Sequence, residues 1–154
     1  MTEIIPHLHQ IGEHELYQIR NADLVIDMGG ITYLTYTQAL VNNERDALKR
    51  YLTCPILSFE IDEVDNEPFS QHEAKMKHVL RVAAFGSFFV RTKLNVYTLC
   101  LAGQNRSGLM SAMILINLGY SADDAIQLIQ SKREDALNNT LLREFVYNFH
   151  LKEN

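Results

Sequence analysis

The sequence predicts an α/β fold, a single domain over residues 1–154 with a central, mostly parallel sheet flanked by helices. Segments with the pattern of strands alternate with segments with the pattern of helices, which is typical of a parallel sheet covered on both faces. No repeat, linker or low-complexity stretch divides the chain. Its 154 residues, of which 47% are hydrophobic, are enough to bury one core.

The N-terminal segments are short and separated by strong breakers. Residues 4–11 have the pattern of a strand pair or an extended segment, and residues 14–19 that of a short helix. Residues 23–27 predict an apolar strand, which Gly29 and Gly30 terminate.

The middle of the chain predicts a helix, a strand and a second helix. Residues 37–51 carry apolar side chains at helical spacing and begin at Thr37, a suitable N-cap. Residues 55–61 predict the next strand. Ser70 then caps a helix, because a glutamate three residues later completes a capping box.

The C-terminal part predicts a strand over 94–99, a buried helix over 109–116 and two further helices. Ser121 caps the first of these two, with acidic residues in its first turn that suit the helix dipole. The second carries its apolar residues between 141 and 149. We expect three aromatic residues of the preceding helix to lie in the core, namely Phe85, Phe88 and Phe89.

The segment Leu99–Gly108 lies between the strand over 94–99 and the buried helix, and it is suited to hold a phosphate. A phosphate dianion needs several donors that converge on one point. Backbone N–H groups of a tight loop supply them, and the positive end of the following helix adds to their field. Gly103 permits a close backbone approach that a side chain would block.

Three side chains in this segment carry the predicted chemistry. Arg106 presents a planar fork that can bind two phosphate oxygens at once. The same positive field favours the thiolate of Cys100, and thiolate attack on phosphorus gives a covalent intermediate. Ser107 can donate a hydrogen bond to that thiolate and help it leave in the second step.

This segment resembles the active-site loop of the cysteine-dependent protein phosphatases, in particular the small dual-specificity group, which usually carries His-Cys-x-x-Gly-x-x-Arg-Ser. The chain matches at Cys100, Gly103, Arg106 and Ser107, and it has Leu99 where the family usually has a histidine that helps hold the loop. In element order the resemblance covers nearly the whole chain. It implies that the loop binds the phosphate through Leu101, Ala102, Gly103, Gln104, Asn105 and Arg106.

A cysteine followed by an arginine six residues later is a weak pattern by itself. The alternative interpretation is a buried cysteine that ends a core strand. Gly103, Ser107, and the strand and helix on either side of the loop favour the phosphate site. Asn105 either braces the loop through its side chain or points into solvent.

The general acid is expected after the strand over 55–61, because ligands of open α/β sheets gather at the carboxyl ends of strands. The leaving oxygen needs a proton, and the carboxyl groups in this segment are Asp62, Glu63, Asp65 and Glu67. In the family an aspartate a few residues after this strand supplies the proton. Asp62 fits that position best, and Asp65 is the alternative. The non-catalytic interpretation of these acids is a solvated surface turn.

Composition restricts the class of partner and the compartment. The net charge of −5 and the lack of a basic stripe argue against a nucleic-acid-binding protein. Cys54 and Cys100 make no disulfide framework, and a free nucleophilic thiol favours a reducing, cytoplasmic location. We expect no signal peptide and no membrane-spanning segment. No metal or organic cofactor is expected, since Arg106 and the loop amides supply the electrostatic stabilisation.

The predicted function is hydrolysis of phosphotyrosine, and also of phosphoserine and phosphothreonine, in a phosphoprotein or phosphopeptide. The chain has no extra segment to build deep walls around a phosphotyrosine ring, which indicates a shallow pocket. Two alternatives stay open. The run 103–108 also resembles the loop of the RNA 5′-triphosphatases of the same superfamily, and Leu99 is compatible with a non-catalytic phosphate-binding module.

Overall fold

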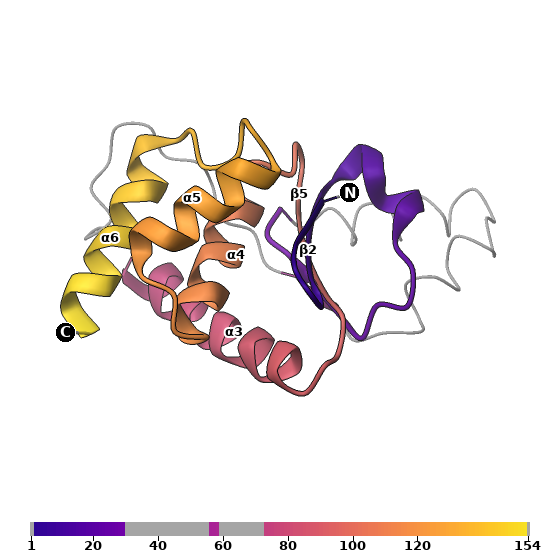
Figure 1. Cartoon of the computed structure of the whole chain (residues 1–154), viewed down its shortest axis with the longest axis horizontal. Helices are drawn as coiled ribbons and strands as arrows, with labels where there is room; N and C mark the ends of the chain where they lie inside the picture. Colours follow the sequence, from indigo (N-terminus) through magenta and orange to yellow (C-terminus); the bar gives the residue numbers. More distant parts are fainter. Residues whose placement is uncertain (1, 30–55, 59–72, 154) are drawn as a thin grey trace.

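A computed structural model describes residues 2–29, 56–58 and 73–153 of the chain, and Figure 1 shows its elements around one sheet. In chain order the elements are β1 (Thr2–Ile5), β2 (Leu8–Gly12), the 3-10 helix η1 (Glu13–Gln18), β3 (Leu24–Asp27), β4 (Ile56–Ser58), α3 (Glu73–Arg91), β5 (Val96–Cys100), α4 (Arg106–Asn117), α5 (Ala122–Lys132) and α6 (Thr140–Glu153).

The sheet is mixed but mostly parallel, as predicted. Its strand order is β1-β2-β5-β3-β4, and only the pairing of β1 with β2 is antiparallel among the described strands. Strand β5 therefore lies in the centre, and all five of its residues are buried. Gly12 is paired with Cys100, and Asp27 is paired with Leu99. The carboxyl ends of β2, β3 and β5 consequently meet at one edge of the sheet.

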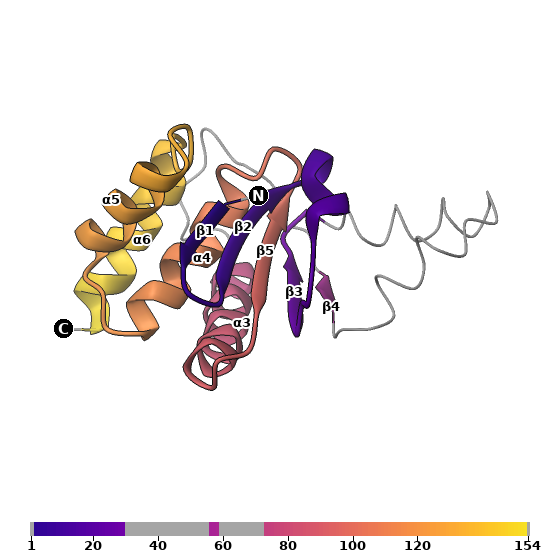
Figure 2. The ribbon, with the colours of Figure 1, turned by 45° about the vertical axis from the view of Figure 1, so that its right-hand side comes forward.

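Helices α3 to α6 all lie on the same side of the sheet (Figure 2). Helix α4 is the central one, because it contacts β2 and β5 as well as the other three helices. Nine consecutive residues of α4 are buried, from Ser107 to Leu115. This confirms the buried helix predicted after the loop, and it fixes the start of α4 firmly against the end of β5.

The opposite face of the sheet carries a smaller apolar cluster. Four side chains of the strands form it, Ile11, Val25, Tyr97 and Leu99, and the segment around η1 covers them with Leu16, Ile19 and Ala22. Leu99 is fully buried in this cluster. The residue before Cys100 thus contributes packing to the fold and no polar side-chain group to the loop that follows.

Most of the sequence-predicted elements that fall in the described residues are present. The strand pair, the short helix and the strand over 23–27 are confirmed by β1, β2, η1 and β3. Ser121 caps α5 as predicted, with its hydroxyl accepting a hydrogen bond from the Asp124 N–H at 3.1 Å. The predicted helix over 37–51 and the cap at Ser70 lie outside the described residues, as does much of the strand over 55–61.

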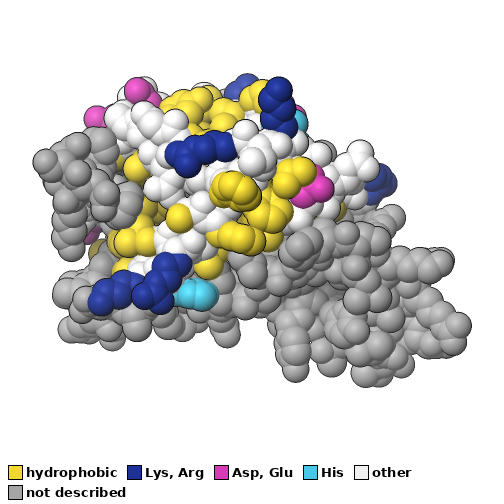
Figure 3. Space-filling view, turned by 90° about the horizontal axis from the view of Figure 1, so that it is seen from below, with side chains coloured by type: hydrophobic (Ala, Val, Ile, Leu, Met, Phe, Trp, Pro, Cys, Tyr) yellow, Lys and Arg dark blue, Asp and Glu magenta, His cyan; other side chains and the backbone are white. Residues whose placement is uncertain are grey.

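The prediction that all three aromatic residues of α3 are core residues was wrong. Phe85 and Phe88 are 45% and 59% exposed, whereas Phe89 is partly buried against the core. Figure 3 views the molecule from the side on which α3 lies and shows hydrophobic side chains gathered on this face. The helix buries one stripe that includes Val79, Ala83 and Val90, whereas Phe85 and Phe88 project from the opposite side of the helix and stay in contact with solvent. Among the described helices, none has the length and hydrophobicity that a membrane-spanning segment needs.

Candidate active site

Cys100 ends the central strand, and Arg106 begins helix α4, so the five residues between them form a tight loop. Cys100 is 2% exposed, and its Sγ lies 3.3 Å from the Oγ of Ser107. Ser107 is fully buried in the first turn of α4. The Nε atom of Arg106 is also buried. The thiol therefore lies at a helix N-terminus, beside a hydroxyl.

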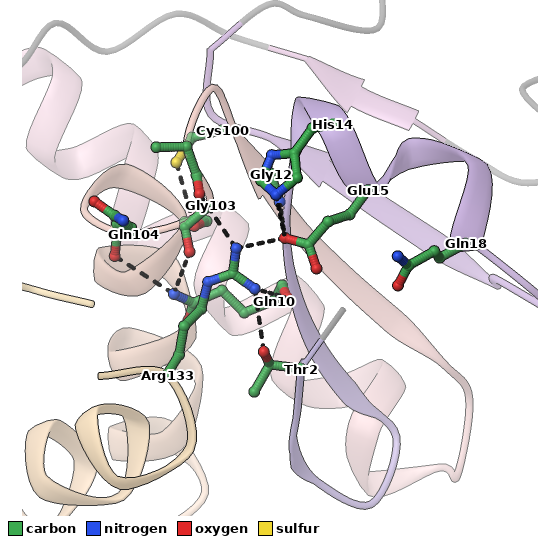
Figure 4. Close-up of polar contacts among 12 residues, drawn as sticks. Thr2, Gln10, Gly12, His14, Glu15, Gln18, Cys100, Gly103, Gln104 and Arg133 are labelled. Carbon is green, nitrogen blue, oxygen red and sulfur yellow. Dashed lines mark hydrogen bonds and ion pairs between the residues drawn. The ribbon is translucent and has the colours of Figure 1, made fainter. Parts of the chain in front are cut away.

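The carbonyl groups of this loop are bound by donors that surround it. The carbonyl oxygen of Leu101 accepts from the Glu13 N–H at 2.9 Å, and that of Gln104 accepts from the Leu137 N–H at 3.2 Å. The two carbonyls between them accept from side chains. Arg133 Nη2 donates to the Ala102 oxygen at 3.2 Å, and Gln10 Nε2 donates to the Gly103 oxygen at 2.9 Å (Figure 4).

These bonds determine where the loop N–H groups point. The described peptide bonds are trans, and in a trans peptide the C=O of one residue and the N–H of the next point in opposite directions. Carbonyls turned outward at residues 101–104 therefore turn the N–H groups of residues 102–105 toward the inside of the loop. Four amide donors then lie on the inner side of the loop, at the N-terminus of α4, an arrangement suited to an oxyanion.

Gly103 and Gly12 allow the loop to lie directly against the end of β2. Gly103 has a φ of +70°, and a Cβ there would lie 2.4 Å from the Gly12 nitrogen and 2.5 Å from the Ile11 carbonyl carbon. A Cβ on Gly12 would in turn lie 2.8 Å from the carbonyl of Ala102. Position 103 thus requires glycine for two reasons: its backbone φ is positive, and the neighbouring main chain leaves no room for a side chain.

We expect Gly103→Ala to destabilise the fold by about 2–4 kcal/mol, because a strained backbone angle and a contact with rigid main-chain atoms add together. Gly119 is a matched control: its φ is +107°, and a Cβ there would meet no atom within 4 Å. Gly119→Ala should therefore lose only the backbone contribution, about 1–2 kcal/mol. The free energies of unfolding of both variants, measured in urea, test this expectation. Equal losses of free energy would show that the contact of residue 103 with β2 adds nothing to the destabilisation.

The far end of the loop is braced by the side chain of Asn105. Its Oδ1 accepts from the Asn139 N–H at 2.9 Å, and its Nδ2 donates to Asn138 Oδ1 at 2.6 Å. Asn139 in turn accepts a hydrogen bond from the Leu142 N–H, in the first turn of α6. Of the two alternatives for Asn105, the structure therefore shows the bracing one, which ties the loop to the connection between α5 and α6.

The sequence did not point to Gln10, Gly12 and Arg133, which contact the loop, or to Glu15, which binds Gly12 and Arg133. All four lie far from the loop in the sequence, and no local pattern marks Gln10, Glu15 or Arg133. The glycine that follows a strand-like run was the one available signal. The candidate acids Asp62 and Asp65 lie outside the described residues, as does Cys54. In the described part of the chain, no group of three or more His, Cys, Asp or Glu could hold a metal ion.

Comparison with known proteins identifies solved structures with this fold. The sequence matches no protein-family model, and no curated protein sequence is similar to it. The structure of Tk-PTP in its active form is similar over 98% of this chain and 96% of that chain, with a TM-score of 0.70 and 19% identity. Human DUSP28 is similar over 99% and 97%, with a TM-score of 0.70 and 14% identity. PTPMT1, solved in complex with PI(5)P, is similar over 97% and 94%, with a TM-score of 0.66 and 20% identity.

These neighbours are dual-specificity or protein tyrosine phosphatases. The resemblance stated from the residues around Cys100 is thus confirmed at the level of the fold, and it extends over nearly the whole chain. Because the identities are 14–20%, the comparison shows the architecture, and the activity has to be argued from the loop itself.

Proposed function

We propose that the chain is a cysteine-dependent phosphatase that hydrolyses phosphate monoesters through a phosphoryl-Cys100 intermediate. The observation that carries the proposal is the orientation of the loop. Its carbonyls at residues 101–104 are bound on the outside, so the amides of residues 102–105 point to the inner side of a loop that runs from a cysteine to a helix N-terminus. A structural cysteine at the end of a core strand has no need of such a loop.

In the first step the Cys100 thiolate attacks phosphorus, the S–P bond forms and the P–O ester bond breaks. The leaving oxygen takes a proton from a carboxyl group, for which we propose Asp62, with Asp65 as the alternative. Arg106 and the loop amides bind the three non-bridging phosphoryl oxygens, whose negative charge is greatest in the transition state.

In the second step water attacks the phosphoryl group, and the S–P bond breaks. The same aspartate, now ionised, accepts the proton of the attacking water. Ser107 donates a hydrogen bond to the departing thiolate from its position 3.3 Å away. The two steps balance without a metal or an organic cofactor, because water supplies the oxygen and the carboxyl group returns to its starting state.

For the substrate, we propose phosphotyrosine together with phosphoserine and phosphothreonine in a protein or peptide. The structural neighbours are phosphatases of the tyrosine and dual-specificity types, which supports this class. One neighbour, PTPMT1, was solved with a phosphoinositide. Residues 101–105 of this chain contain no lysine to bind additional phosphate groups, so a phosphoinositide is disfavoured.

The test of this function is phosphate release from four substrates: a small aryl phosphate, a phosphotyrosine peptide, a phosphoserine peptide and a 5′-triphosphate RNA. We expect turnover of the first three. Release from the RNA alone would favour the triphosphatase. Retention of the phosphopeptides without phosphate release would establish a phosphate-binding module and contradict the proposal.

The general acid is assigned by comparing aryl phosphates that have good and poor leaving groups. A poor leaving group needs the proton, whereas an acidic phenol leaves without it. We expect Asp62→Ala to lower kcat by about 100-fold for the poor leaving group and much less for the good one. Asp65→Ala is the matched control, and a leaving-group-dependent loss in Asp65→Ala alone would move the role to Asp65.

A further inference from the structure

The phosphate loop receives no polar side-chain support from the residue that precedes its cysteine. Leu99 is apolar and fully buried among Ile11, Val25 and Tyr97 on the sheet face opposite the large helices. The groups that fix the orientation of the loop must therefore come from other elements. Two side chains, those of Gln10 and Arg133, donate to loop carbonyls, and Arg133 is the charged one.

Arg133 follows the last residue of α5 and extends its guanidinium to the outside of the loop (Figure 4). Its Nη2 donates to the Ala102 oxygen and to Glu15 Oε1. Its Nη1 donates to Thr2 Oγ1 at 3.1 Å and to the Gln10 carbonyl oxygen at 3.3 Å. One planar group thus joins β1, β2, η1 and the loop, a set of contacts that a lysine ammonium cannot reproduce.

Glu15 completes the arrangement as the counter-charge of Arg133. The two side chains are 8% and 15% exposed, so the ion pair is largely shielded from water. Glu15 Oε1 also accepts from the Gly12 N–H at 3.1 Å, and His14 Nε2 lies 3.6 Å from it. Gly12 is the residue against which Gly103 packs. The carboxylate therefore holds the end of β2, and the guanidinium holds the loop that lies on it.

We propose that Glu15 and Arg133 are a positioning pair for the phosphate loop: they fix the peptide between Ala102 and Gly103, so that the Gly103 N–H points at the bound oxyanion. The inference rests on the proposed function and adds two residues to it that do not touch the substrate. Arg133 binds the Ala102 carbonyl from the outside of the loop. Because the peptide is planar, the Gly103 N–H must then point in the opposite direction, to the inside.

The electrostatics of Arg133 agree with this position. Burial lowers the pKa of Arg133, and the negative charge of Cys100 acts in the opposite direction. The guanidinium is thus close enough to the nucleophile for their charges to interact.

Arg133→Lys is the variant that tests the pair, because it keeps the positive charge and the partner of Glu15 but loses the fork. Arg143→Lys is the matched control, since Arg143 lies on α6 and its side chain donates to Thr140 instead of the loop. For each protein we would measure the dissociation constant of tungstate by calorimetry, kcat and KM for a small aryl phosphate, and the thermal unfolding midpoint.

We expect Arg133→Lys to weaken tungstate binding by about 10-fold or more and to lower kcat as well as raise KM, because one amide donor is no longer held toward the anion. Arg143→Lys should match the parent protein in all measurements. If Arg133→Lys does not fold, the double variant Glu15→Gln with Arg133→Met removes both charges and leaves no unpaired ion. It should show the same loss of tungstate affinity.

The outcomes separate this inference from the proposed function. A folded Arg133→Lys protein whose tungstate affinity and kcat stay within about twofold of the parent overturns the positioning pair, and the phosphatase proposal stands if the parent hydrolyses the ester. Tungstate binding that depends on Arg133, in a parent protein without turnover, supports the pair and overturns the phosphatase. A parent protein that binds no tungstate overturns both.

Discussion

Cys100→Ser is expected to lower kcat for a small aryl phosphate by about 10⁴-fold or more, as is found when a nucleophile is removed from an enzyme that forms a covalent intermediate. The serine hydroxyl is not ionised near neutral pH and is a much weaker nucleophile than a cysteine thiolate. Steady-state rates for both proteins, with product followed for several hours, give the ratio.

The same variant should keep its fold and its affinity for oxyanions. Serine is close to cysteine in size, and the donors that hold the loop do not involve the Cys100 side chain. Cys54→Ser is the matched control, because it makes the same change at the other cysteine of the chain, and it should leave kcat unaltered. Turnover by Cys100→Ser at more than about a tenth of the parent rate would place the nucleophile elsewhere.

Arg106→Lys is expected to lower kcat/KM by about 10²- to 10³-fold, although the charge is retained. Arg106 begins α4, where its guanidinium can bind two phosphoryl oxygens in one plane, and its Nε atom is buried against the protein. An ammonium group offers a point charge of different reach, so part of the transition-state stabilisation is lost.

Separate values of kcat and KM for Arg106→Lys show which of the two constants accounts for the reduction of kcat/KM. In the role proposed for it, Arg106 binds the phosphoryl oxygens most strongly when they carry the most charge, so the reduction should appear mainly in kcat. A variant with unchanged kcat and only a raised KM would show that Arg106 binds the substrate and its transition state equally. That result would contradict the role proposed for it.

The parts of the fold that the sequence predicts are those set by local pattern. A strand, a small-residue loop and an apolar helix in succession define the surroundings of Cys100, and β5 and α4 lie where that pattern places them. Ser121 likewise predicts the start of α5, because an N-cap acts on amides only three residues away.

What the sequence does not reveal depends on contacts between distant segments. Arg133 and Glu15 are separated by 118 residues, and each taken alone has the pattern of an exposed charge near a helix end. Gln10 is fully buried although its residue type is usually exposed, because its amide binds the loop carbonyls. The exposure of Phe85 and Phe88 is a different case, because their spacing from Val79, Ala83 and Val90 already places them on the opposite side of α3, and the expectation of burial followed their residue type alone.

In the proposed reaction Cys100 carries the phosphoryl group during turnover, and detecting the group on this residue is the most direct test. Ser107→Ala removes the hydroxyl that lies 3.3 Å from Cys100 Sγ, so it should slow the second step and let the intermediate accumulate. We would quench the parent and this variant during turnover of an aryl phosphate and map the peptides by mass spectrometry. We expect one phosphoryl group on the peptide that contains Cys100, in higher yield for Ser107→Ala. Steady turnover with the phosphoryl group on another residue, or on none in either protein, would contradict it.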